Sequence, residues 1–223
     1  MNTDPPAQRH SKANEAELIA DPQLKAEAEA LNGLRQFDAG RAIIRDALER
    51  GSFKLRISHL LGLQREALAG ISSYAGNFRP AGVAIEGSKH TPPGAHMVPE
   101  MVEEMCDYVN DHWAEATAIH LAAYVMWRLN WIHPFADENG RTSRTTSYVV
   151  LCIKLGSDLP GLPTIPQQIV ENRSPYFDAL DAADAAWREE RIDLSKMEEL
   201  LSGMLAKQLH GAYQQAGGVT SEI

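Results

Sequence analysis

Apolar residues recur at every third or fourth position along most of the chain, a pattern typical of amphipathic α-helices. The pattern is clearest from Val98 to Trp113, where the apolar side chains fall on one stripe. Acidic residues fall mainly off that stripe: Glu100, Glu103, Glu104 and Asp107. We expect these carboxylates to face solvent rather than to form a metal site, because they lie on the polar side of the helix.

Two other segments are apolar nearly all round, at about residues 116–131 and 145–155. A helix without a polar face belongs in the centre of a bundle, so we expect these two helices to be central. The chain has two cysteines, Cys106 and Cys152, and both fall on apolar faces. We therefore expect buried thiols rather than a disulfide.

Further helices are predicted on both sides of these segments. Residues 15–50 favour helix with a break near Gly40, and residues 54–69 carry a mostly one-sided apolar pattern. Towards the C-terminus, Ser174, which is followed by proline, and Asp193 are typical helix starts.

Glycine, proline and serine interrupt the helical pattern between residues 70 and 94. The short alternating piece Val83-Ala84-Ile85 within it predicts a small β-hairpin or an extended flap. The chain is therefore expected to be all-α with one small β element. We divide it into a helical lead-in at 1–52, disordered to about residue 14, a core at 53–160, and C-terminal helices that pack on the core at 161–223.

Charge and composition argue against several classes of function. The 223 residues carry 21 basic and 30 acidic side chains, a net charge of −9, which argues against non-specific binding to a nucleic acid backbone. No apolar run approaches the roughly 20 residues that a membrane-spanning helix needs. The polar N-terminus lacks the apolar core of a signal peptide, so we expect a cytoplasmic protein. Secretion into another cell by a specialised system would leave no trace in this sequence.

One twelve-residue segment, HPFADENGRTSR at 133–144, concentrates chemically active side chains. His133 can accept a proton near neutral pH, and Asp137 offers the hard oxygen ligands that Mg²⁺ prefers. Arg141 and Arg144 lie three residues apart, so on a helix they share a face and can bind phosphate oxygens together. The combination predicts phosphoryl or nucleotidyl transfer.

This segment resembles the signature of the Fic family in the Fic/Doc superfamily, HPFxxGNGRxxR with an acidic residue at the fifth place. The matching residues are His133, Pro134, Phe135, Asp137, Asn139, Gly140, Arg141 and Arg144. The similarity extends from about Lys54 to Leu155 and includes a flap-like stretch at 82–93. It implies a Fic-like helical bundle in which the signature lies between two central helices, as the hydrophobic pattern also suggests.

Fic-type enzymes typically transfer AMP from ATP to a hydroxyl of a target protein. The resemblance therefore implies a Mg²⁺-dependent nucleotidyltransferase that uses ATP and modifies a Ser, Thr or Tyr residue of a partner protein. It implies that His133 is the general base and that Asp137 holds the Mg²⁺. Arg144 is expected either to bind the terminal phosphate or to brace the loop.

The remaining signature residues are expected to bind the nucleotide. Asn139 and Gly140 would present amide and backbone N–H groups to phosphate oxygens at a helix start, and Arg141 would contact the β- or γ-phosphate. The resemblance also implies that a flap docks the target by strand addition, with an ordinary surface hairpin as the alternative. The flap residues are Val83, Ala84, Ile85, Glu86, Gly87 and Ser88.

Glu138 stands where the family usually has glycine, within the expected nucleotide site. A carboxylate that points inward would repel a triphosphate by roughly 3 kcal/mol at about 5 Å, whereas one that points outward would be harmless. Three outcomes therefore stay open: normal AMP transfer, a related transferase that uses another nucleotide-linked donor, and a catalytically weak protein-binding module.

Many family members are restrained by a helix of pattern S/T-x-x-x-E-G/N, whose Glu pairs with the second signature arginine. Residues 11–15 carry the first half of that pattern, but Ala16 follows in place of Gly or Asn. We therefore infer no clear self-inhibitory helix, and we keep a separate small regulator and a homodimer as open alternatives.

Overall fold

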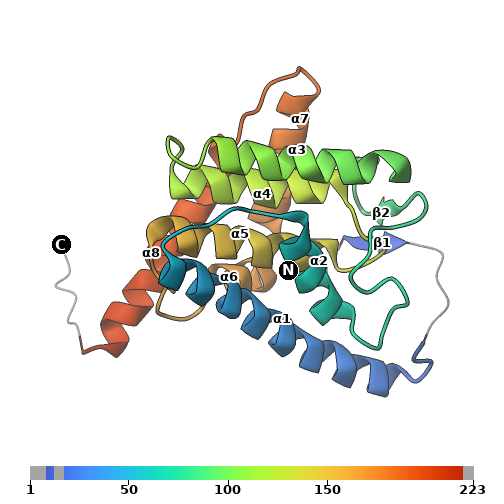
Figure 1. Cartoon of the computed structure of the whole chain (residues 1–223), viewed down its shortest axis with the longest axis horizontal. Coiled ribbons are helices and arrows are strands. Elements are labelled where there is room, and N and C mark those ends of the chain that lie inside the picture. Colours follow the sequence, from blue (N-terminus) through green and yellow to red (C-terminus); the bar gives the residue numbers. More distant parts are fainter. Residues whose placement is uncertain (1–8, 13–17, 218–223) are drawn as a thin grey trace, which may run out of the picture.

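α4 (Ala118–Ile132) and α5 (Asn139–Leu155) run through the middle of a helical bundle and pack against each other (Figure 1). This computed structural model describes residues 9–12 and 18–217 of the chain. Most residues of both helices are buried, which confirms the prediction of two central helices. Cys106 and Cys152 are free, buried thiols, as expected.

The other helices of the described residues cover this central pair. They are α1 (Pro22–Arg50), α2 (Ile57–Leu68), the 3₁₀ helix η1 (Ala95–Met97), α3 (Val98–Asp111), α6 (Ile165–Glu171), α7 (Ser174–Trp187) and α8 (Ser195–Gln215). α1 and α2 pack against each other and against α5, whereas α3, α7 and α8 pack against α4. The signature loop between α4 and α5 is thus framed by rigid elements.

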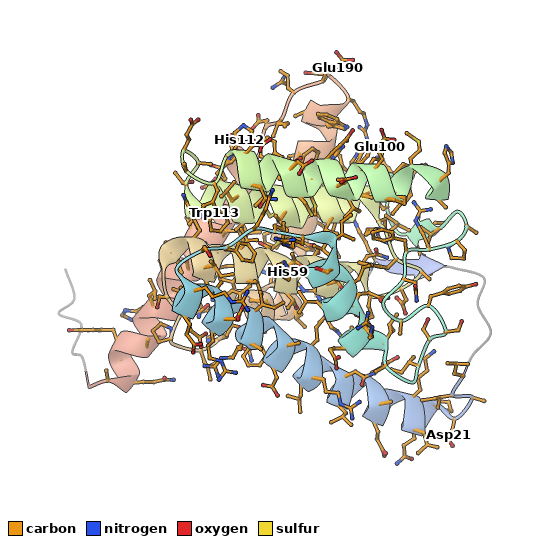
Figure 2. All side chains as sticks on the ribbon, in the orientation of Figure 1. Asp21, His59, Glu100, His112, Trp113 and Glu190 are labelled. Atoms are coloured by element: carbon orange, nitrogen blue, oxygen red, sulfur yellow. The ribbon has the colours of Figure 1, made fainter. Side chains whose placement is uncertain are left out.

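α1 is one continuous helix, so the expected break near Gly40 is wrong. Asp21 starts the helix by accepting hydrogen bonds from backbone N–H groups of the first turn (Figure 2), and Gly51 ends it in the left-handed conformation with φ 64°. Gly40 is buried where α1 packs on α5, and a Cβ atom there would lie 3.2 Å from Cγ2 of Thr145. The glycine therefore lets two helices approach closely rather than ending one of them.

Two further predictions about the remaining helices are confirmed: the acidic face of α3 is exposed, and Ser174 and Asp193 lie at helix starts. The four acidic residues off the stripe of α3 are exposed, as Glu100 illustrates (Figure 2). α7 begins at Ser174, and Asp193 accepts a hydrogen bond from the backbone N–H of Ser195 at the start of α8. None of the helices in the described part of the chain is long and apolar enough to span a bilayer.

β1 (His10–Lys12) and β2 (Ala84–Glu86) form an antiparallel two-stranded sheet at the edge of the bundle (Figure 1). The expectation of disorder to about residue 14 is therefore wrong for residues 10–12, and residues 1–8 and 13–14 lie outside the described part of the chain. β2 lies in the expected flap. Its partner strand comes from the N-terminal segment instead of the second arm of a hairpin.

Candidate active site

The loop between α4 and α5 carries the signature residues and is fixed at both ends. His133 ends α4 with φ 53°, and Glu138 precedes α5 with φ 61°, so both residues adopt the left-handed conformation. Between them, Phe135 is fully buried, and its backbone N–H and C=O form hydrogen bonds of 2.9 and 2.8 Å with the side-chain amide of Asn139. These contacts restrain the loop and place the start of α5 beside His133.

A cavity of about 330 Å³ opens beside this loop and is lined by the start of α5, by α7 and by the flap, together with Arg9. All the expected catalytic, phosphate-binding and metal-binding residues line it: His133, Asp137, Glu138, Asn139, Gly140, Arg141 and Arg144. Two of the expected flap residues, Ile85 and Ser88, also line it. The other four flap residues do not: Val83, Ala84, Glu86 and Gly87.

α7 contributes cavity residues that no sequence motif marks. Arg173, Tyr176 and Phe177 lie at the start of this helix and line the same cavity. The available signal was weak, because a cation and two aromatic residues around a predicted helix start have many structural explanations. Only the packing of α7 against α4 brings them to the signature loop.

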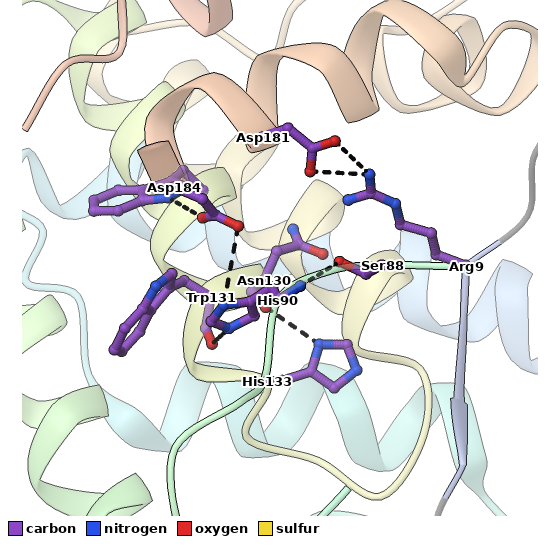
Figure 3. Close-up of polar contacts among 9 residues, drawn as sticks. Arg9, Ser88, His90, Asn130, Trp131, His133, Asp181 and Asp184 are labelled. Atoms are coloured by element: carbon purple, nitrogen blue, oxygen red, sulfur yellow. Dashed lines mark hydrogen bonds and ion pairs between the residues drawn. The ribbon is translucent and has the colours of Figure 1, made fainter. Parts of the chain in front are cut away.

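His133 lines the cavity although only 6% of the residue is exposed. Its Nδ1 atom lies 3.2 Å from the backbone oxygen of Asn130 (Figure 3). Because a carbonyl oxygen only accepts hydrogen bonds, Nδ1 carries the hydrogen, and Nε2 is the nitrogen that can take a proton. Burial lowers the pKa of His133 to about 4, and the charge of Arg79 adds to this effect. The imidazole is therefore neutral at neutral pH.

Arg79 fixes the backbone around His133 from outside the signature. Its Nε donates to the backbone oxygen of His133 at 2.7 Å, and its backbone N–H donates to Pro134 at 2.9 Å. Its Nη atoms donate to the backbone oxygens of Ala81 and Pro93, one at each end of the flap. The buried guanidinium thus ties both ends of the flap to the loop that carries the imidazole.

The first turns of α5 present positive charge to the cavity. Arg144 lies over Gly140, because a Cβ atom at residue 140 would be 3.2 Å from Nη1 of Arg144. Burial lowers the pKa of Arg144, and within residues 9–12 and 18–217 no ion pair to its guanidinium is found. The charge of Arg173 lies near it and lowers its pKa further. These cations and the N–H groups of a helix start suit a polyanion.

Glu138 lines the same cavity, and its carboxylate points inward because it pairs with Arg141, another residue of the lining. One carboxylate oxygen lies 3.1 Å from Nε of Arg141, and only 16% of the Glu138 side chain is exposed. Burial raises the pKa of Glu138 to about 7, and the charge of Arg141 only partly offsets this effect. Arg141, the expected phosphate ligand, is thus paired with an acid of the loop itself.

Asp137 is an exposed residue that lines the cavity, and its Oδ1 atom accepts a hydrogen bond of 2.7 Å from the backbone N–H of Glu138. In the described part of the chain, no group of three His, Cys, Asp or Glu side chains could hold a metal ion. The exposed carboxylate of Asp137 beside the cations of α5 fits Mg²⁺, which binds proteins through one or two carboxylates and takes other ligands from phosphates and water. Asp137 is the residue that could hold it.

A sequence model of the Fic/DOC family matches residues 54–151. Protein adenylyltransferase fic-1 of Caenorhabditis briggsae is 30% identical over 139 residues, which cover 61% of this chain and 26% of that protein. Protein adenylyltransferase Fic of Drosophila persimilis is 31% identical over 133 residues, which cover 59% of this chain and 24% of that protein. The matched part is thus about a quarter of the length of these curated relatives.

Solved structures show the same fold. A Fic domain containing signaling protein from Bacteroides thetaiotaomicron superposes with a TM-score of 0.68 at 18% identity, over 91% of this chain and 78% of that one. Fic-1 from C. elegans superposes with a TM-score of 0.67 at 19% identity, over 89% of this chain and 54% of that one. The expected Fic-like helical fold is therefore confirmed.

Proposed function

Residues 54–151 form a Fic/DOC family domain, and from this premise we propose that the chain transfers AMP from ATP to a hydroxyl group of a target protein. The observation that carries the proposal is the convergence of His133 and Arg144 on one cavity beside the start of α5. The first residue supplies a proton acceptor and the second a half-buried cation. The names of the curated relatives, protein adenylyltransferases, support the same chemistry.

In the proposed reaction, a Ser, Thr or Tyr oxygen of the target attacks the α-phosphorus of ATP. A new O–P bond forms while the bond from the α-phosphorus to the bridging oxygen breaks, and pyrophosphate leaves with that electron pair. The proton of the hydroxyl passes to Nε2 of His133, which is neutral and can accept it. Negative phosphate charge near the ring then stabilises the protonated imidazole.

The phosphates are proposed to bind at the start of α5, where Arg144 and Arg141 balance their charge and the backbone N–H of Gly140 donates to an oxygen. Asp137 would hold Mg²⁺, which when bound offsets charge on the leaving pyrophosphate. Asn139 is proposed to act mainly by shaping the loop, because its side-chain amide is hydrogen-bonded at both ends within it.

The inward carboxylate of Glu138 favours a second candidate, a catalytically weak module that docks a partner on its flap. The pairing of Glu138 with Arg141 places negative charge where we propose that the triphosphate binds. Calorimetry with ATP–Mg²⁺ separates the two candidates, because absence of binding to both the natural chain and Glu138→Gly would favour the weak module. A panel of labelled ATP, GTP, UTP and CDP-choline tests whether another nucleotide-linked donor is used.

His133→Ala should abolish transfer of a label from the α-phosphate of ATP, because the variant lacks the proton acceptor. Loss of a general base lowers a rate by about 10²- to 10⁴-fold. The measurement is incorporation of label into the proteins of a cell extract. Both the reference chain and the His133→Ala chain carry Glu138→Gly, which removes the inward carboxylate.

His120→Ala is the matched control for that experiment. His120 also belongs to α4 but contacts Tyr108 and Glu198 outside the cavity, so its loss should leave labelling unchanged. Circular dichroism checks that both variants keep their helices. Undiminished labelling by a folded His133→Ala chain would exclude this residue as the base.

A further inference from the structure

The strand edge of the flap is occupied by the chain's own N-terminal segment. β1 lies antiparallel to β2, and Ser11 is paired with Ile85 in the register of the sheet. Ile85 lines the cavity that His133 also lines. If the flap docks targets by strand addition, as the sequence resemblance implies, residues 9–12 lie where a target segment would lie.

Arg9, directly before β1, anchors this segment on α7. Its Nη2 atom lies 2.9 and 2.8 Å from the two carboxylate oxygens of Asp181 (Figure 3). Its guanidinium carbon lies 4.5 Å from the centre of the Phe177 ring. Phe177 and Asp181 are one helical turn apart, so a ring face and a carboxylate meet the same cation.

Burial distinguishes this contact from an ordinary surface ion pair. Only 16% of the Arg9 side chain is exposed, whereas 56% of the Asp181 side chain is exposed. The guanidinium of Arg9 is therefore largely enclosed, whereas the carboxylate of Asp181 stays at the surface. A planar guanidinium that both stacks on a ring and bonds a carboxylate fits this arrangement better than the compact ammonium of lysine does.

We infer that Asp181 and Phe177 form an arginine subsite for an extended peptide segment docked along the flap. The arginine lies two positions before the residue paired with Ile85, as Arg9 lies two positions before Ser11. The ligand is thus an extended segment of the form Arg-x-Ser, Thr or Tyr, and its hydroxyl position rests on the proposed function. The chain's own residues 9–12 occupy this docking site and compete with such a target segment.

A labelled synthetic peptide, PAQRHSKANE, tests this inference by fluorescence anisotropy against the 223-residue chain. It copies residues 6–15, so it carries the arginine in its natural register. Arg9→Ala should weaken the hold of the chain's own segment, and this variant should bind the peptide about tenfold more tightly than the natural chain does. A peptide with Ala in place of the arginine should bind the variant about tenfold more weakly than PAQRHSKANE.

Asp181→Asn in the Arg9→Ala chain should remove the preference for arginine. Asp178→Asn is the matched control, because Asp178 is an exposed acid of the same helix, whereas the ion pair of Arg9 is with Asp181. Absence of peptide binding, equal affinity for the two peptides, or equal effects of the two Asn variants would each overturn the inference.

Hydrogen exchange of the β2 amides supplies a second measurement that needs no added peptide. Arg9→Ala and Asp181→Asn should each speed exchange, and the double variant should exchange no faster than Arg9→Ala alone, because that change already removes the contact with Asp181. Additive effects would show that the two side chains do not act together. Neither measurement involves nucleotide or turnover, so their failure would leave AMP transfer standing, and absent labelling would leave the subsite standing.

Discussion

Glu138 combines two unfavourable features in one residue. Its φ of 61° costs a residue with a side chain roughly 1 kcal/mol, and glycine adopts this conformation freely. Its carboxylate also pairs with Arg141, so a triphosphate bound at the proposed site would have to displace the carboxylate or share the cation with it. The inward orientation that the sequence left open is therefore the observed one.

Glu138→Gly should tighten binding of ATP–Mg²⁺ by roughly tenfold or more. The full repulsion of an isolated charge pair is not recovered, because Glu138 has a pKa of about 7 and is partly protonated at neutral pH. Calorimetry of both chains measures the change. Glu138→Gln keeps the side chain and removes the charge, so tightening in both variants identifies the charge as the cause. Unchanged affinity in both would mean that the carboxylate swings away when nucleotide binds.

His133 and Glu138 should give the free energy of unfolding opposite pH dependences. The pKa of His133 falls from 6.5 to about 4, so between these values only the unfolded chain binds the proton, and stability rises with pH. The pKa of Glu138 rises from 4.5 to about 7, so between these values the folded chain holds the extra proton, and stability falls as pH rises.

Glu138→Gln isolates the contribution of His133, because the opposing group is then gone. The unfolding free energy of this variant, minus that of the double variant with His133→Asn, should rise with pH between about 4 and 6.5. The expected rise is at most about 3 kcal/mol. Urea unfolding across that range measures it, and a constant difference would mean that the imidazole titrates as in the unfolded chain.

At the scale of the elements, the contact of α1 with α5 depends on the absence of one side chain. Gly40→Val should destabilise the fold by about 1–3 kcal/mol, because the added atoms press on Thr145 and Val149. Gly62→Ala in α2 is the control, since a Cβ there meets no atom within 4 Å. That change should stabilise by up to about 1 kcal/mol through helix propensity. Urea denaturation compares them, and equal effects would refute a close helix contact at Gly40.

At the scale of the whole molecule, the lead-in and C-terminal helices pack on the central pair and share its core. α1 packs against α5 and α8 against α4. The buried side chain of Gln208 in α8 donates to the Tyr148 hydroxyl on α5 and accepts from the backbone N–H of Ile165 at the start of α6. The three segments proposed from the sequence therefore share one network of contacts.

We expect one cooperative unfolding transition, because no segment keeps its core when another unfolds. Tryptophan fluorescence reports on the turn after α3, where Trp113 lies, and on α4 and α7, and far-ultraviolet circular dichroism reports on all helices. Their urea transitions should coincide, and Gln208→Ala should shift both to lower urea together. Two separated transitions would mean that the lead-in or the C-terminal helices unfold independently.

The sequence by itself determined the helical class, the two central helices, several helix starts and the signature loop. These features depend on neighbouring residues: hydrophobic period, capping side chains and the order of reacting groups are all local. The tertiary structure alone decided that Gly40 lies at a close contact between α1 and α5 and that Glu138 faces inward. It also decided that Arg79 contacts the signature loop and that Arg9 contacts α7. Those outcomes depend on which distant segments pack together, because side-chain orientation follows the partners that packing supplies.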